Sequence, residues 1–143
     1  MGIGTVIVHH AQREEADRAA KHLQAASFRT VVAHDAQDIP ALIVQEQADA
    51  VLLDAEGNPQ ATWDLCTELR DAQSAKEVGV IVALPAFLQR VSEARTAGAT
   101  EILVKPLNAR ELAARVAMVV RLLAARARRR RLAERLEASQ TEG

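Results

Sequence analysis

The chain has few aromatic side chains. Phe28, Trp63 and Phe87 are the whole set, and tyrosine is absent. Proteins that bind single-stranded nucleic acid commonly stack the bases on aromatic rings. The shortage of rings therefore disfavours a nucleic-acid binder of this kind.

Cysteine is nearly absent as well, since Cys66 is the only one. A single cysteine excludes a disulfide within the chain and disfavours a cysteine-based zinc site. Redox chemistry needs an exposed and activated thiolate. We expect Cys66 to be a small core residue on a helix instead.

Long apolar runs are missing too. No run approaches the roughly 18 residues that a membrane-spanning helix needs, and the N-terminus lacks the basic and apolar regions of a signal peptide. We therefore expect a cytoplasmic protein without a membrane partner.

The rest of the composition is typical of one soluble globular domain. The 143 residues are 49% apolar and 26% charged, and a chain of this length buries a core without metals or disulfides. Residues 1–110 have ten Lys or Arg against fifteen Asp or Glu, a net charge of −5. Residues 111–143 have eight Arg against four Glu, a net charge of +4. The sequence is an acidic body with a basic tail.

Short apolar runs alternate with amphipathic stretches along the chain. Runs that are apolar throughout are typical of parallel strands covered by helices on both faces. The pattern predicts strands at residues 5–9, 28–33, 50–54, 78–84 and 101–104, and helices at residues 12–26, 38–47, 63–73, 87–97 and 108–138. We therefore predict an α/β fold: a doubly wound, flavodoxin-like, five-stranded parallel sheet with an extended C-terminal helix.

The carboxyl ends of the predicted strands are the expected place for a functional site, because open parallel sheets bind their ligands there. The side chains at that edge are His9 and His10, Asp54, Ala83 and Lys105. A buried Asp54 needs a cationic or hydrogen-bonding partner, and Lys105 is the candidate.

Several motifs carry a resemblance to a known family. They are Asp54 at a strand end, Leu69-Arg70, Ala97-Gly98-Ala99 and Leu103-Val104-Lys105-Pro106. On these, residues 5–122 resemble the receiver domain of bacterial response regulators, the chemotaxis-type fold, in an atypical or pseudo-receiver form. The resemblance implies a cis-linked Pro106 and an Asp54 in the position that accepts a phosphoryl group from a histidine kinase. It also implies a Lys105 that contacts this group.

The pocket departs from the pattern of that family at four positions. His9 and His10 replace the two acids that help to hold magnesium, Ala83 occupies the position of the phosphoryl-binding hydroxyl, and Ile102 that of the aromatic switch. Glu56, two residues after Asp54, offers partial compensation. Because Mg²⁺ prefers carboxylate oxygen to imidazole, we expect weak or absent phosphorylation of Asp54. A magnesium cofactor is expected only if the pocket works.

The two histidines admit three interpretations. They could bind a transition metal together with Asp54, because imidazole suits Zn²⁺, Ni²⁺ or Cu²⁺. One of them could be a pH switch beside Asp54, or both could be polar residues at a loop end. Adjacent residues of a strand point in opposite directions, so one ring is expected to face away from the site.

The last predicted helix is longer than the sheet requires. We place the receiver-like domain at residues 1–122 and read residues 123–143 as an extension, either a dimerisation stalk or a linker to an output domain. Leu122, Leu123, Leu132 and Leu136 are the residues predicted to pair with another helix, although arginines interrupt them. The basic run at residues 126–131 is interpreted as a solvated face and not as a specific nucleic-acid site.

These observations favour a non-enzymatic signalling domain that acts by protein–protein contact and forms a homodimer through its last helix. A conventional response regulator phosphorylated on Asp54 by a histidine kinase is the first alternative. A small metal-dependent α/β enzyme using His9, His10 and Asp54 is the second. Its weakness is the lack of a recognisable nucleophile–base pair.

Overall fold

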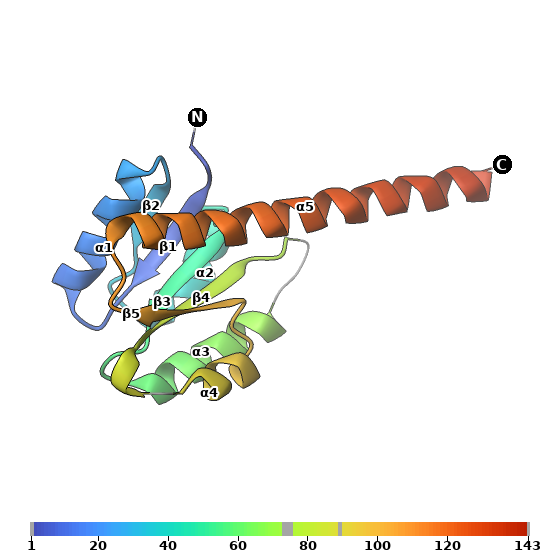
Figure 1. Cartoon of the computed structure of the whole chain (residues 1–143). Coiled ribbons are helices and arrows are strands. Elements are labelled where there is room, and N and C mark those ends of the chain that lie inside the picture. The colour runs from blue at the N-terminus through green and yellow to red at the C-terminus, as the bar shows by residue number, and fades with distance from the viewer. Residues whose placement is uncertain (1, 73–75, 89, 143) are drawn as a thin grey trace.

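A five-stranded parallel sheet forms the centre of the computed structural model, which describes residues 2–72, 76–88 and 90–142 (Figure 1). The strand order is β2-β1-β3-β4-β5, so the prediction of a doubly wound parallel sheet is confirmed. The strands are β1 (Thr5–His9), β2 (Arg29–Val32), β3 (Ala50–Asp54), β4 (Gly79–Pro85) and β5 (Glu101–Lys105).

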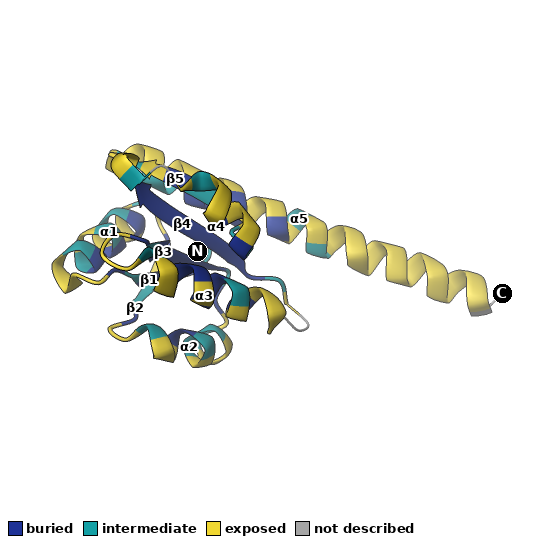
Figure 2. Cartoon of the chain, turned by 90° about the horizontal axis from the view of Figure 1, so that it is seen from below, coloured by how far each residue is buried: buried dark blue, intermediate teal, exposed yellow. Residues whose placement is uncertain are grey.

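Helices cover both faces of the sheet and bury two separate apolar clusters. They are α1 (Arg13–Ala25), α2 (Ile39–Gln45), α3 (Pro59–Asp71), α4 (Val91–Ala97) and α5 (Ala109–Glu142), with short 3₁₀ turns at Ala36–Asp38 and Ala86–Leu88. One cluster packs α1 and α5 on the sheet, and the other packs α2, α3 and α4 on the opposite face. The central strands β3 and β4 are buried throughout most of their length, as Figure 2 shows.

Helix α3 begins four residues earlier than predicted, within the stretch expected to be a loop. The side chain of Asn58 accepts a hydrogen bond from the Ala61 N–H at 3.1 Å, and Pro59 follows in the first turn. Proline is tolerated there because a first-turn N–H has no helical partner. The predicted starts of α2 and α4, at residues 38 and 87, lie instead in the 3₁₀ turns Ala36–Asp38 and Ala86–Leu88. The predicted residues Gln73 and Gln89 lie outside the described residues.

Helix α5 has 34 residues, which corresponds to about 51 Å, and it extends four residues beyond the predicted end. Only its first half covers the sheet; the second half runs free of the body in Figure 1 and is exposed on nearly all sides in Figure 2. Leu123 is 5% exposed and belongs to the core cluster of α1 and α5. Its prediction as a dimer-helix residue was wrong, because it faces the sheet beside Gly79.

The boundary predicted after residue 122 falls within the part of α5 that still contacts the body. Arg126 donates to Glu77 at 3.2 Å, beyond that boundary. Among the described residues, no helix is both long enough and apolar enough to cross a membrane.

Candidate functional site

Asp54 and Lys105 meet at the carboxyl edge of the sheet. Asp54 ends β3 and Lys105 ends β5, with the β4 residues Ala83 and Pro85 beside them in register. The Lys105 ammonium donates to Asp54 Oδ2 at 2.7 Å. The Asp54 side chain is only 11% exposed, so this hydrogen-bonded cation compensates a largely buried carboxylate.

Glu56 adds a second carboxylate to the same ammonium. Lys105 Nζ donates to Glu56 Oε2 at 2.9 Å, and the Glu56 backbone N–H donates to Asp54 Oδ1 at 2.9 Å. Each oxygen of Asp54 therefore has a donor within the chain. The structure brings Glu56 into the site, as the sequence suggested it could.

These contacts perturb two ionisable groups in opposite directions. The hydrogen bond and the charge of Lys105 hold the pKa of Glu56 below its ordinary value. Burial lowers the pKa of Lys105, but the hydrogen bonds and charges of Asp54 and Glu56 outweigh it, so the net pKa is raised. Both shifts keep Glu56 and Lys105 charged across the neutral range.

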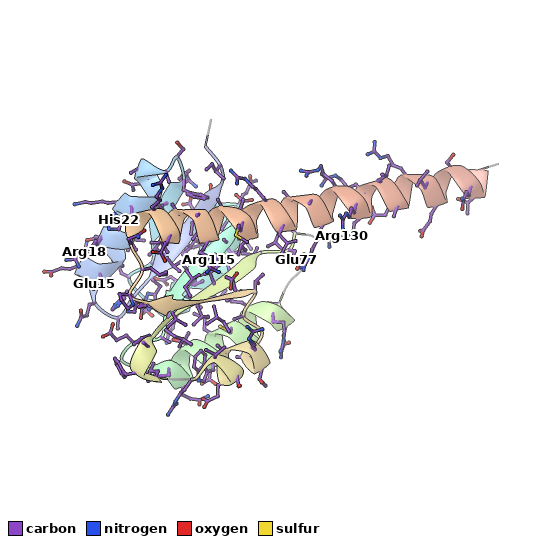
Figure 3. The ribbon with its side chains drawn as sticks, in the orientation of Figure 1. Glu15, Arg18, His22, Glu77, Arg115 and Arg130 are labelled. Carbon is purple, nitrogen blue, oxygen red and sulfur yellow. The ribbon has the colours of Figure 1, made fainter. Side chains whose placement is uncertain are left out.

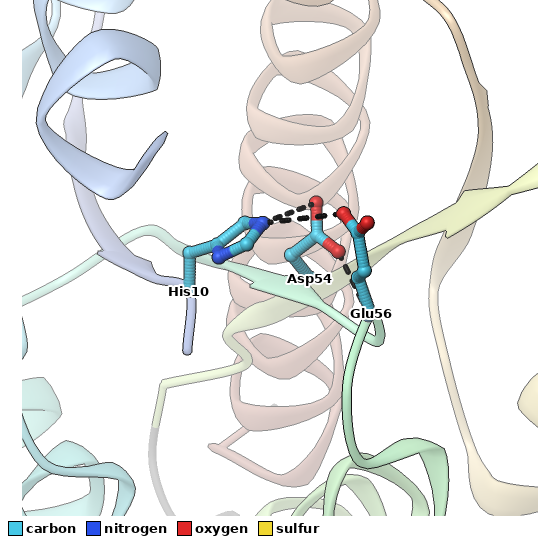
Figure 4. Close-up of side chains that lie close together, drawn as sticks. All are labelled: His10, Asp54 and Glu56. Atoms are coloured by element: carbon cyan, nitrogen blue, oxygen red, sulfur yellow. Dashed lines mark hydrogen bonds and ion pairs between the residues drawn. The ribbon is translucent and has the colours of Figure 1, made fainter. Parts of the chain in front are cut away.

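His10 lies beside the two carboxylates and directs a ring nitrogen toward them, as Figure 4 shows, and its side chain is 7% exposed. Its Nε2 is 3.5 Å from Asp54 Oδ2 and 3.6 Å from Glu56 Oε2, and this nitrogen has no hydrogen-bond partner among the described residues. The backbone N–H of Gln12 donates to His10 Nδ1 at 2.9 Å. Nδ1 must then keep its lone pair, so the neutral ring carries its proton on Nε2 and directs it toward the carboxylates.

His9 points elsewhere, as the alternation of strand residues predicted for one of the two rings. Its Nδ1 donates to the Ala33 carbonyl at 2.9 Å, toward β2. The predicted metal set of His9, His10 and Asp54 is therefore not brought together. The side chains that gather are His10, Asp54 and Glu56, whose ligand atoms lie within 4.8 Å of one another.

A metal ion at this group would disturb bonds that the chain already makes. A ligating His10 Nε2 must give up its proton, and moving that proton to Nδ1 removes the acceptor for the Gln12 N–H. The carboxylate oxygens that face Nε2 are the ones bound by Lys105. Gln12 was missed by sequence reasoning because its contribution is a backbone donor, which any residue except proline supplies.

A cavity of about 240 Å³ lies beside the site on the side of α1 and α5. Its wall includes Ala83, Leu52 and Lys105, and its rim includes Arg18 and His22 of α1 (Figure 3). Ala83 is buried and its methyl group faces this space without any hydrogen-bonding capacity. The small side chain leaves room at the position next to Asp54.

Solved structures with a similar arrangement of strands and helices include response regulators. The signal receiver domain of a Bermanella marisrubri response regulator matches with a TM-score of 0.74 and 19% identity, over 84% of this chain and 99% of that one. The chain has the receiver-domain fold. A CheY-like receiver domain from Methylobacillus flagellatus matches with a TM-score of 0.69 and 16% identity, over 81% of this chain and 98% of that one. No family model and no curated protein matches the sequence.

The receiver fold with the long α5 is found in a larger protein as well. NtrX from Brucella abortus, solved in complex with ADP, matches with a TM-score of 0.83 and 20% identity. The match covers 96% of this chain, which spans 30% of that one. Because only about 4% of this chain is left out, most of α5 is included in the match.

The residues of this receiver fold do not fit a magnesium ion well. The Lys105–Pro106 peptide bond is cis, as the resemblance implied. Yet His10 lies where the resemblance places an acid, and Lys105 binds both remaining carboxylates. Ile102, at the position of the aromatic switch, is partly buried against the cluster under α3 and α4, and it offers no ring to move.

Proposed function

We propose that the chain is a receiver-like signal-transduction domain that acts by protein–protein contact, with weak or no magnesium-dependent phosphorylation. The observation that carries this proposal is that both carboxylate oxygens of Asp54 already accept hydrogen bonds from groups of the same chain. One oxygen accepts from Lys105 and the other from the Glu56 N–H, and His10 Nε2 lies 3.5 Å from Asp54 Oδ2. Phosphoryl transfer needs charge neutralisation around the incoming group, and here the available cation is already engaged.

The proposed route of output is the last helix. The second half of α5 carries exposed leucines at residues 132 and 136, which are 54% and 57% exposed. An exposed apolar helix face of this length is typical of a surface that pairs with another helix. We propose homodimerisation through α5, with a histidine kinase or an output domain as the further protein partner. NtrX, in which a similar unit is part of a longer chain, supports the second of these.

A conventional phosphorylation switch is the alternative. It is favoured by the presence of a second carboxylate, Glu56, next to Asp54, since two carboxylates are the ligands that Mg²⁺ prefers. This alternative requires Lys105 to release at least one of them on metal binding. Enzymatic metal chemistry with His9, His10 and Asp54 is not proposed, because His9 faces β2.

Intact mass after incubation with a small-molecule phosphodonor and Mg²⁺ separates these functions. Wild type and Asp54→Asn are compared, with an ordinary receiver domain as the positive control. The proposal expects no added phosphoryl on either chain while the control is labelled. A phosphoryl on wild type alone would establish the conventional switch and overturn the proposal.

A further inference from the structure

The solvent face of α5 carries a regular stripe of residues. Successive members are spaced by four and three residues, which is the spacing of a coiled-coil seam. We call this stripe the α5 seam; it consists of Met118, Leu122, Ala125, Arg129, Leu132 and Leu136. Its four large apolar side chains are 46–58% exposed. It lies on the side of α5 opposite the core face, which contains Val116 and Leu123.

The order of side chains along the α5 seam is symmetric about residue 127. Met118 and Leu136 lie nine residues on either side, Leu122 and Leu132 lie five, and Ala125 and Arg129 lie two. We propose that two copies of the chain pair through the α5 seam with their helices antiparallel, the two-fold axis passing near residue 127. This inference rests on the proposed homodimer and specifies its geometry.

The antiparallel arrangement matches large side chains with large ones along the seam. Met118 packs on Leu136 of the second copy, and Leu122 on its Leu132. Arg129 lies opposite the small Ala125, past which its long side chain reaches water. A parallel pair instead sets Arg129 against Arg129 in the middle of the seam, where two like charges repel.

The midpoint of α5 lies close to the proposed two-fold axis. The helix runs from Ala109 to Glu142, so its midpoint lies within two residues of position 127. Under the proposed symmetry residue 142 lies opposite residue 112. The two helices then overlap along about 46 Å, and each extension covers the part of α5 that crosses the body of the other copy.

Net charge does not distinguish the two orientations. Residues 124–143 contain six arginines and three glutamates, and the segment that they cover in the antiparallel pair, residues 111–130 of the second copy, contains six arginines and one glutamate. The orientation therefore rests on the order of the side chains along the α5 seam. Arg126, near the axis, is compensated within its own chain by Glu77 at 3.2 Å.

Distances between spin labels test the orientation directly. One label is placed at Thr141→Cys, an exposed position outside the seam, and in a separate sample at Arg128→Cys near the axis. The native Cys66 is fully buried and burial raises its pKa to about 11, so it does not react with the label. The Asp54 site is untouched in both variants.

The proposal expects a distance of about 42 Å between the two labels at residue 141, from 28 residues of helix rise. It expects a short distance at residue 128. Short distances at both positions would show a parallel pair; they would overturn the antiparallel geometry and leave the proposed dimer standing. No dipolar coupling at either position, or a long distance at residue 128, would overturn the α5 dimer itself.

Discussion

The carboxyl edge of the sheet and the second half of α5 differ in how many of their side chains have a partner within the same chain. At the sheet edge, Asp54, Glu56 and Lys105 compensate one another at 2.7–2.9 Å. Along α5, Leu132 and Leu136 remain more than half exposed. The charged groups at the sheet edge are paired with one another, while the exposed leucines in the second half of α5 have no packing partner among the described residues.

This difference indicates where a partner contributes most. Adding a ligand at the sheet edge must first break contacts that the chain already has. Covering the α5 seam removes apolar surface from water, which is favourable by roughly 25 cal/mol per Å². The comparison therefore favours control by assembly over control by phosphorylation.

The largest expected effect is the loss of the dimer in Leu136→Glu. The new carboxylate would be buried against Met118 of the second copy, so the dissociation constant should rise by about 100-fold or more. Sedimentation velocity across a concentration series measures it. Ala138→Glu adds the same charge at an exposed position outside the seam and should leave the dimer in place. Equal weakening by both variants would contradict a seam-specific contact.

The neighbours Leu122 and Leu123 separate the two faces of α5. Leu123 is buried and Leu122 is 46% exposed. In a monomeric Leu136→Glu background, Leu123→Ala should lower the free energy of unfolding by about 2–4 kcal/mol, and Leu122→Ala by about 0.5 kcal/mol. Urea unfolding measures both. A large loss for Leu122→Ala would mean that this residue packs within the monomer.

Lys105→Met tests whether the sheet edge is compensated by its own cation. Removing the ammonium leaves Asp54 largely buried without its charged donor, which should cost about 1–3 kcal/mol in the free energy of unfolding. The double variant Asp54→Asn/Lys105→Met should recover part of this loss. Additive losses in this double-mutant cycle would argue against the pairing.

The smallest effect is expected for Glu56→Gln, and it depends on pH. Because the folded pKa of Glu56 is lowered from 4.5, its pairing with Lys105 stabilises the fold above that value. The stabilisation is lost as pH falls through the lowered pKa. The difference in unfolding free energy between wild type and Glu56→Gln should shrink below pH 4.5. A difference that grows on acidification would contradict the assigned shift.

Much of the fold could be predicted from the sequence. Apolar runs placed the strands within about one or two residues of their ends, because buried parallel strands need continuous apolar side chains. The start of α3 was missed because it depends on the Asn58 cap and on Pro59 in the first turn. Both residue types also occur in loops.

The site was predicted only in part. Asp54 and Lys105 were identified from their place at strand ends and Glu56 from the resemblance, and the structure joins the three side chains. The role of each histidine depends on which way its ring turns, which the hydrogen bonds to Gln12 and Ala33 decide. Leu123 was misassigned because the prediction from sequence did not include Met118 and Ala125 in the α5 seam. The steps of four and three residues from Met118 through Leu122 to Ala125 leave Leu123 outside the seam.

The central claim is that the chain assembles through α5 without phosphorylation. Sedimentation velocity of the wild-type chain, with and without Mg²⁺ and a small-molecule phosphodonor, tests it most directly. The account predicts a dimer of the same affinity under both conditions. A chain that is monomeric without the phosphodonor and dimeric with it would contradict the account.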